Sequence, residues 1–348
     1  MVKGDYTVYL KVIDSYVYDF DQNVVDIIYG LQNYDRVILD LKVESPDFTK
    51  LGITDTLEKI ISTYNVPYGK LVLKTGNMIE QCKLVQVEIV NSAELAKNVS
   101  MYRNELNLMF DTPDIKKEIQ KHFGIYIGRS NYARLALASY LEHYYGDITD
   151  LTFHCDPTSD YHKSHIGLDQ LFHNFGTRHP ISRAATQFIH KIPITKDVIT
   201  AYPIAHSTPL YGLADAYSNI FLDIVCETMS TGDTFNRWTE KGKRAVMFKT
   251  PFLLFGPRNF LGNIKKLGYK TFEPWWNESY DHSEGAQRVN EITSIIDYLA
   301  KKPLSEIISM YGDMQDVLEY NRELMLEHTR NFTKLNYDEF KKQFSVGS

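Results

Sequence analysis

One short stretch of the chain brings together a helix-capping residue, a carboxylate and several cations. Thr239 is followed by Glu240, Lys241, Lys243 and Arg244, and then by an apolar turn that suits packing on a sheet. Thr239 can cap a helix, so the charged side chains fall near its start. In α/β folds, ligands bind at the amino ends of helices and the carboxyl ends of strands. Lysine and arginine suit a diphosphate there, and the carboxylate suits ribose hydroxyls.

A second group with similar chemistry lies earlier in the chain. The apolar run 123–127 predicts a strand that ends in Gly128 and Arg129, and a helix follows from about residue 132 to 145. A glycine at this turn allows a phosphate to approach the backbone closely. The strand-end position favours a ligand contact for Arg129. Arg134 is as consistent with a surface arginine of the helix as with a ligand contact.

The elements that must position these side chains alternate between strands and helices. In the first part of the chain, the patterns predict strands at 6–13, 36–40, 70–74 and 83–90 and helices at 24–31 and 54–63. In the second part they predict strands at 123–127, 151–153, 220–225 and 252–255 and helices at 114–122, 132–145, 240–248, 260–267, 287–301 and 305–344. Such alternation predicts an α/β fold with largely parallel sheets. Glu227 follows the strand at 220–225 and would face the same crevice as Lys241.

Several segments of the second part carry a family resemblance. They are Glu227-Thr, Thr239-Glu-Lys, Pro251-Phe-Leu-Leu-Phe-Gly, Leu267-Gly-Tyr-Lys-Thr-Phe and Glu278-Ser-Tyr-Asp. Together they resemble the donor-binding half of a glycosyltransferase group of phages, giant viruses and bacteria, which is distantly similar to fucosyltransferases and exostosins. The resemblance covers roughly residues 121–300. Gly242 departs from the threonine or phenylalanine of the group, and we expect it to alter the pocket rather than abolish it.

The resemblance implies a donor site for a nucleoside-diphosphate sugar, with a UDP-sugar favoured and no obligatory metal. Arg129, Lys241 and Arg244 would bind the diphosphate, where negative charge grows on the leaving group. Glu240 would bind the ribose or the sugar, and Glu227 the sugar hydroxyls. The remaining residues assigned to this site are Gly128, Arg134, Thr239 and Lys243.

The group has the GT-B fold, in which two Rossmann-like domains face a cleft. The resemblance therefore implies an acceptor-side domain at 1–118, a donor domain at 119–300 and helices at 301–348 that cross back to the first domain. The polar stretch 91–120 is the expected junction.

Acidic residues near the amino terminus offer a different chemistry. Asp19-Phe-Asp21 matches the Asp-x-Asp pattern of metal-dependent sugar transferases, but such a pair arises often by chance, and Asp21 can instead cap the helix at 24–31. We expect no metal there. Asp14 or Asp19 is a candidate general base that would take a proton from an acceptor hydroxyl. A solvated loop carboxylate is the alternative for each.

The acceptor is suggested by one basic, aromatic loop. Arg178, Arg183 and Lys191 are interleaved with aromatic residues, which suits stacking on bases and pairing with phosphates, and equally suits a loop over the donor nucleotide. Because T-even-type phages glycosylate 5-hydroxymethylcytosine in DNA, a flipped hydroxymethylcytosine is the favoured acceptor. A glycan or lipid-linked acceptor, or a non-catalytic nucleotide-sugar-binding protein, is the alternative. The DNA hypothesis requires these cations and Lys265-Lys266 to share one face.

Composition limits the class of protein. The chain has 348 residues, 43% of them hydrophobic and 24% charged, with a formal net charge of -6, which is typical of a globular protein without a generally basic coat. Its three cysteines lack metal-ligand spacing, and no apolar run reaches the roughly 20 residues of a membrane helix. We expect a cytoplasmic protein.

Two further motifs have two interpretations each. The stretch from His154 to His165 contains three histidines, two aspartates and a cysteine, but the spacing matches no zinc pattern, so a polar loop is favoured. The pair Trp275-Trp276 could line a pocket, although packing between helices is commoner for such rings.

Overall fold

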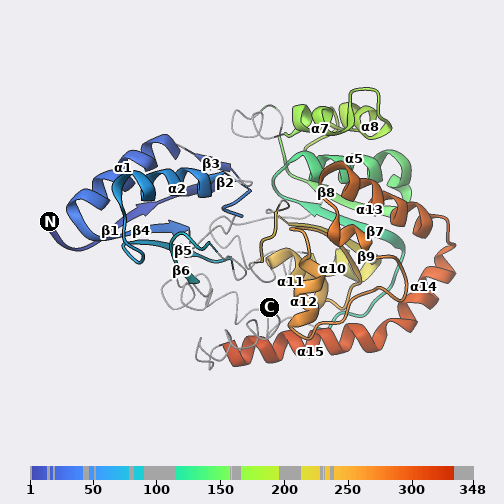
Figure 1. The fold of residues 1–348 in the computed structure, drawn as a ribbon. Helices are drawn as coiled ribbons and strands as arrows, with labels where there is room; N and C mark the ends of the chain where they lie inside the picture. Colours follow the sequence, from blue (N-terminus) through green and yellow to red (C-terminus); the bar gives the residue numbers. More distant parts are fainter. Residues whose placement is uncertain are drawn as a thin grey trace. The chain divides into compact units, whose positions relative to one another are not determined.

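The computed structural model shows a mixed α/β protein that divides into two compact units. Residues 1–98 and 228–237 form the first unit, and residues 99–227 and 238–348 form the second. Each unit contains a four-stranded sheet of parallel neighbours (Figure 1). The structure describes residues 2–13, 16–18, 20–41, 47–50, 52–77, 82–89, 114–156, 158, 166–195, 213–227, 230, 232–235 and 239–332. The predicted α/β class with largely parallel sheets is confirmed, and the finer GT-B assignment stays a prediction.

The sheet of the first unit has the strand order β1-β4-β5-β6. Its elements are β1 (Val2–Tyr9), the antiparallel pair β2 (Lys11–Ile13) and β3 (Tyr16–Tyr18), α1 (Phe20–Asn33), β4 (Tyr34–Leu41), α2 (Ile53–Tyr64), β5 (Leu71–Thr75) and β6 (Gln86–Ile89). Val37 and Leu39 alternate on β4 and are fully buried in one apolar cluster with Ile27 of α1 and Leu57 of α2. Period-two strand residues and one face of each helix thus build the core.

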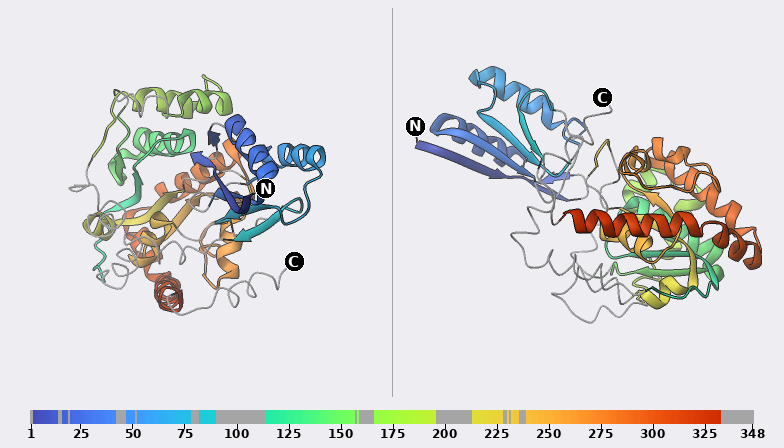
Figure 2. Two further views of the ribbon diagram at one scale, coloured as in Figure 1. Left: turned by 90° about the vertical axis from the view of Figure 1, so that its left-hand side faces the viewer. Right: turned by 90° about the horizontal axis from the view of Figure 1, so that it is seen from below.

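The sheet of the second unit has the order β10-β9-β7-β8. Its elements are β7 (Lys121–Ile127), α5 (Tyr132–Tyr145), η1 (Gly146–Ile148), β8 (Thr149–Phe153), α7 (Leu168–Phe175), α8 (Pro180–Phe188), α10 (Ala214–Asn219), β9 (Ile220–Cys226), α11 (Glu240–Met247), β10 (Phe252–Phe255), α12 (Phe260–Lys266), η2 (Ser279–His282), α13 (Gly285–Ala300), α14 (Leu304–Asp313) and α15 (Gln315–Phe332). Figures 1 and 2 show α5 and α8 on one side of this sheet and α15 on the other. Every residue of β9 is buried, because helices cover both faces.

Three sequence predictions about elements are wrong. Residues 114–120 do not form the predicted helix. They have no regular secondary structure, and the N–H groups of Glu118 and Gln120 donate to the carbonyls of Ser218 and Asn219 (2.9 and 2.8 Å). Asp21 lies in the first turn of α1 and is not its N-cap, because the helix begins one residue earlier. The long helix predicted from residue 305 is divided at Met314 into α14 and α15.

A fourth correction concerns the connection between β9 and α11. The resemblance implies that this connection is part of the donor domain, but residues 228–237 belong to the first unit. The N–H of Asp233 donates to the Asp47 carboxylate (3.0 Å), and the N–H of Phe235 donates to Asn77 Oδ1 (2.9 Å). The chain therefore leaves the second unit after Glu227 and returns to it before Thr239.

The helices α14 and α15 pack on the second unit. The Asn321 side chain donates to the carbonyl of Lys270 and accepts from its N–H (2.8 and 2.9 Å), and the Tyr269 hydroxyl contacts Met325. The crossing of the last helices to the first domain stays a prediction. Among the described residues, no helix is long and apolar enough to span a membrane.

Candidate functional site

The strand order of the second sheet reverses direction between β7 and β9. The chain passes from β7 through α5 to β8 on one side, and then returns to β9 and β10 on the other. In open α/β sheets, the crevice that binds ligands lies at the carboxyl ends of the strands at such a switch point. Gly128 directly follows β7, and Glu227 directly follows β9. The two residues singled out as strand ends therefore stand on neighbouring strands at the predicted place.

The turn after β7 is open. Gly128 and Arg129 are both exposed, and a Cβ atom added to Gly128 would have no described atom within 4 Å. Two hydrogen bonds of the following residues hold the turn in place. The Ser130 hydroxyl donates to the Ile166 carbonyl (2.7 Å), and Asn131 caps α5 by accepting from the N–H of Arg134 (2.9 Å). A ligand can thus approach this backbone without displacing a described side chain.

Arg134 is buried rather than at the surface of the helix. Its side chain is 3% exposed, and its guanidinium donates to the carbonyls of Arg129 (2.9 Å) and Cys226 (3.1 Å). These carbonyls belong to the turn after β7 and to the end of β9. Arg134 therefore holds the two strand ends in place, which is a supporting position rather than the ligand contact that the sequence suggested.

Glu227 and Thr239 connect the end of β9 to the start of α11. The Thr239 hydroxyl donates to the Glu227 carboxylate, whose oxygens lie 2.8 and 2.6 Å away, and accepts from the N–H of Lys241 (3.3 Å). Glu227 is 2% exposed, and its own N–H donates to the Phe255 carbonyl (2.8 Å). The predicted N-cap is confirmed, and the cap is itself anchored on Glu227.

The charged residues of the first turns of α11 divide into two groups. Lys241 and Lys243 are half-buried, and the Glu240 side chain lies outside the described residues. Arg244 is 7% exposed and interacts with Asp223 and Tyr217 in the interior. This buried position argues against the predicted contact between Arg244 and a diphosphate. Arg244 lies about one turn after the start of α11, and its side chain points into the interior.

The interior partners of Arg244 form a polar cluster that the sequence analysis missed. The Tyr217 hydroxyl donates to Asp223, and Lys117 donates to the carbonyl of Ile220 (3.1 Å) and the hydroxyl of Thr250 (2.6 Å). Burial raises the pKa of Asp223 to about 6 and lowers the pKa of Lys117 to about 7. An aspartate inside the otherwise apolar run of β9 was the one signal in the sequence.

The other acidic and histidine predictions lie mostly beyond the described part of the chain. Asp14 and Asp19 lie outside it, as do His162 and His165. His154 is half-buried at the end of β8, where its N–H donates to the Ile127 carbonyl (3.0 Å). Among the residues that the structure describes, no group of three side chains could hold a metal ion.

The cations assigned to nucleic acid do not share one face. Arg178 and Arg183 are exposed around the start of α8, and Lys191 pairs with Glu142 (2.6 Å). Lys265 and Lys266 lie on α12, on a different side of the second unit from α8 (Figure 1). The requirement of the DNA hypothesis is therefore not met, and only Arg178 and Arg183 remain as neighbouring exposed cations.

Comparisons with known proteins do not assign the chain to a family. No protein-family model matches the chain, and no curated protein or solved structure matches it either. The function must therefore be argued from the residues and their geometry, and the glycosyltransferase resemblance stays a prediction.

Proposed function

We propose that the protein is a glycosyltransferase that moves a sugar from a nucleoside-diphosphate sugar, with a UDP-sugar favoured, to a hydroxyl group. The second unit would bind the donor. The observation that carries this proposal is the meeting of two features at the switch point of one sheet. They are the open turn at Gly128 and the start of α11, which Thr239 anchors on Glu227.

Each residue of this edge has a role in the proposal. The exposed turn at Gly128 and Arg129 accepts the diphosphate, because backbone N–H groups and a guanidinium suit its oxygens. Lys241 and Lys243 add positive charge, which stabilises the nucleoside-diphosphate leaving group as negative charge develops on it. Glu227 binds a sugar hydroxyl, since it directly follows β9 and is joined to the start of α11 through Thr239.

The acceptor remains the open part of the proposal. A carboxylate of the first unit, Asp14 or Asp19, would serve as the general base. Hydroxymethylcytosine in DNA is supported by the exposed Arg178 and Arg183 alone, so a glycan or lipid-linked hydroxyl is tested beside it. A non-catalytic nucleotide-sugar-binding protein would use the same donor residues and differ only in the absence of transfer.

The donor is tested by thermal unfolding with UDP, GDP, CMP and their common sugars. A ligand at 100 times its dissociation constant adds about 2.7 kcal/mol of stability. We expect one nucleoside diphosphate to stabilise the protein and Lys241→Ala to weaken the effect. The matched control is Lys59→Ala, which removes an exposed lysine of α2 in the first unit. Stabilisation by none of these ligands, or equal stabilisation of both variants, would refute the donor assignment.

Transfer is then measured with the donor so identified. Labelled sugar is offered to hydroxymethylated duplex DNA, to unmodified DNA and to glycan acceptors. Transfer to hydroxymethylated DNA that falls in an Arg178→Ala, Arg183→Ala variant would establish the DNA acceptor. Transfer to glycans alone would establish the alternative, and donor binding without any transfer would favour the binding protein.

A further inference from the structure

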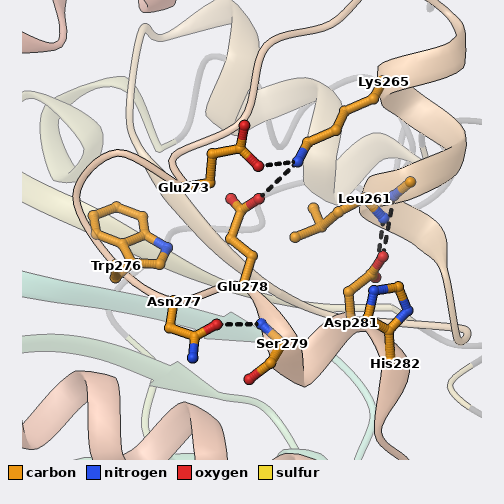
Figure 3. A pocket seen from close by; sticks show the side chains of 10 residues that line it. Leu261, Lys265, Glu273, Trp276, Asn277, Glu278, Ser279, Asp281 and His282 are labelled. Atoms are coloured by element: carbon orange, nitrogen blue, oxygen red, sulfur yellow. Dashed lines mark hydrogen bonds and ion pairs between the residues drawn. The ribbon is translucent and has the colours of Figure 1, made fainter.

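A cavity of about 280 Å³ lies in the second unit, and neither Gly128 nor Glu227 is among the residues that line it. It is lined by residues of α12, of η2 and of the segment between them (Figure 3). The side chains that matter for its chemistry are Lys265, Glu273, Trp276, Asn277, Glu278 and Asp281. The volume is near the lower limit of roughly 300 Å³ for small-molecule pockets, so it suits a single ring rather than a nucleotide sugar.

The indole N–H of Trp276 is the observation that points to a ligand. Trp276 is 5% exposed, and its Nε1 has no hydrogen-bond partner among the described residues. The ring packs against Phe272, with centroids 5.3 Å apart, and Figure 3 shows its nitrogen on the edge turned toward Glu278. A buried indole N–H usually donates to an acceptor, so an oxygen atom is expected beside it.

The buried carboxylates of the cavity are already engaged. Glu278 accepts from the Thr271 hydroxyl (2.7 Å) and the Phe272 N–H (2.8 Å). Asp281 accepts from the first N–H groups of α12, with both distances 3.0 Å. Neither carboxylate accepts from Trp276 Nε1, which has no hydrogen-bond partner among the described residues.

The charge of the lining excludes two classes of ligand. Glu273, Glu278 and Asp281 stand against Lys265, which pairs with Glu273 at 2.6 Å and Glu278 at 3.4 Å. An anion would meet this excess of carboxylates. A cation could not accept a hydrogen bond from the indole. These observations favour an uncharged ligand that carries oxygen atoms able to accept hydrogen bonds.

We propose that this cavity binds one neutral sugar ring. The Trp276 N–H donates to a sugar oxygen, and the Asn277 amide, whose oxygen accepts from the Ser279 N–H (2.9 Å), offers its NH₂ as a second donor. Glu273 is largely exposed and accepts from a sugar hydroxyl. The lining shares no residue with the proposed donor site, and the inference does not depend on the proposed transferase activity.

The test uses the indole N–H signals of the full-length protein labelled with ¹⁵N-tryptophan. The chain has 3 tryptophans, so Trp276→Phe and Trp275→Phe assign the three signals. Glucose, galactose, mannose and N-acetylglucosamine are titrated to about 100 mM without nucleotide, since single sugars bind with millimolar constants. We expect the Trp276 signal alone to shift and saturate with at least one sugar. Saturation transfer to that sugar should weaken about fivefold or more in Trp276→Phe and stay unchanged in Trp275→Phe.

Three results would overturn the proposal. They are a Trp276 signal that no sugar moves, one that moves with inorganic phosphate instead, and sugar binding that Trp276→Phe leaves intact. The first would assign the indole N–H to a buried water. Asn277→Ala is the second variant if Trp276→Phe does not fold. Lys241→Ala should keep sugar binding and Trp276→Phe should keep nucleotide binding, so each proposal can fail without the other.

Discussion

The two sheets of the molecule have the same number of parallel strands but different strand orders. The first sheet is wound in one direction, as β1-β4-β5-β6, whereas the second reverses between β7 and β9. A switch point requires such a reversal, so the described strands of the first sheet offer none. The difference explains why the open glycine turn and the anchored helix start belong to the second unit. Alternating strands and helices alone would predict the same kind of site in both.

The two units also differ in how they place charge. In the first unit, Arg36 of β4 pairs with Asp5 at the surface (2.7 Å). In the second unit, Arg288 and Asp223 are buried and are bonded to the protein interior. Arg288 and Asp223 therefore stabilise the interior of the second unit, whereas the exposed pair of Arg36 and Asp5 contributes little. Four predictions follow from these contrasts.

The largest effect is expected for the two arginines. Arg288 donates to the carbonyls of Tyr280 and Asp281 (both 2.9 Å) and of Gly256, so Arg288→Ala leaves three buried acceptors without it. We expect a loss of about 3 kcal/mol or more in the free energy of unfolding. Arg36→Ala removes an exposed pair and should cost under about 1 kcal/mol. Urea unfolding with hydrogen exchange measures each unit, and equal losses would contradict the contrast.

The second prediction concerns two aspartates with opposite pH dependence. Burial raises the pKa of Asp223 to about 6, whereas the hydrogen bond from Arg36 lowers the pKa of Asp5. Between pH about 4 and 6, folded Asp223 keeps a proton that the unfolded chain has lost, so stability falls as pH rises. The contribution of Asp5 has the opposite sign. It is present above the ordinary pKa of about 3.9 and is lost as pH falls through the lower folded value.

The measurement is urea unfolding of the wild type and Asp223→Asn from pH 4 to 6.5. Other carboxylates act equally in both proteins, so the difference between them isolates Asp223. We expect that difference to change by up to about 3 kcal/mol across this window. Asp5→Asn should change the pH dependence only below about pH 4. A difference between wild type and Asp223→Asn that does not vary with pH would disprove the assignment.

The third prediction is that alanine substitutions at Gly128 and Gly30 have opposite effects on stability and on nucleotide affinity. Gly128→Ala adds a methyl group in open space, so stability should stay within about 0.5 kcal/mol while nucleotide affinity falls about tenfold. A Cβ atom at Gly30 of α1 would lie 2.6 Å from the Tyr6 ring and 2.9 Å from Val37. Gly30→Ala should therefore cost about 1 kcal/mol through overpacking and leave nucleotide binding unchanged. Loss of affinity in both variants would mean that binding follows overall stability.

Local patterns predicted most of this architecture. The buried strands β7, β9 and β10 and the cap at Thr239 were predicted because their signals come from adjacent residues. Gly268 has φ +93 after α12, as the predicted helix end requires. Such features depend on backbone preferences and on the apolar faces of single elements.

The failures share a different cause, which is a partner far away in the sequence. Residues 114–120 are not helical because Glu118 and Gln120 form hydrogen bonds with the chain just before β9. Arg134 and Arg244 would be expected at the surface from their charge. Instead Arg134 donates to the Cys226 carbonyl of β9, and Arg244 interacts electrostatically with Asp223 of β9. No local pattern reveals either partner. The segment 232–235 joins the first unit through Asp47 and Asn77. The sequence identified the residues of the site by their type. Only the strand order shows that β7 and β9, which Gly128 and Glu227 follow, are neighbours.

The smallest effect is expected for two threonines, each near the start of a helix in one of the units. Thr239 caps α11 and donates to Glu227, whereas the hydroxyl of Thr54 in α2 has no partner among the described residues. Thr239→Ala should lower stability by about 1 kcal/mol, Thr239→Ser should restore it, and Thr54→Ala should do little. Nucleotide titration decides what the cap is for. If Thr239→Ala weakens binding and Thr239→Ser recovers it, the anchored start of α11 positions Lys241. Unchanged affinity at lowered stability would make the cap structural and leave the diphosphate to Gly128 and Arg129 alone.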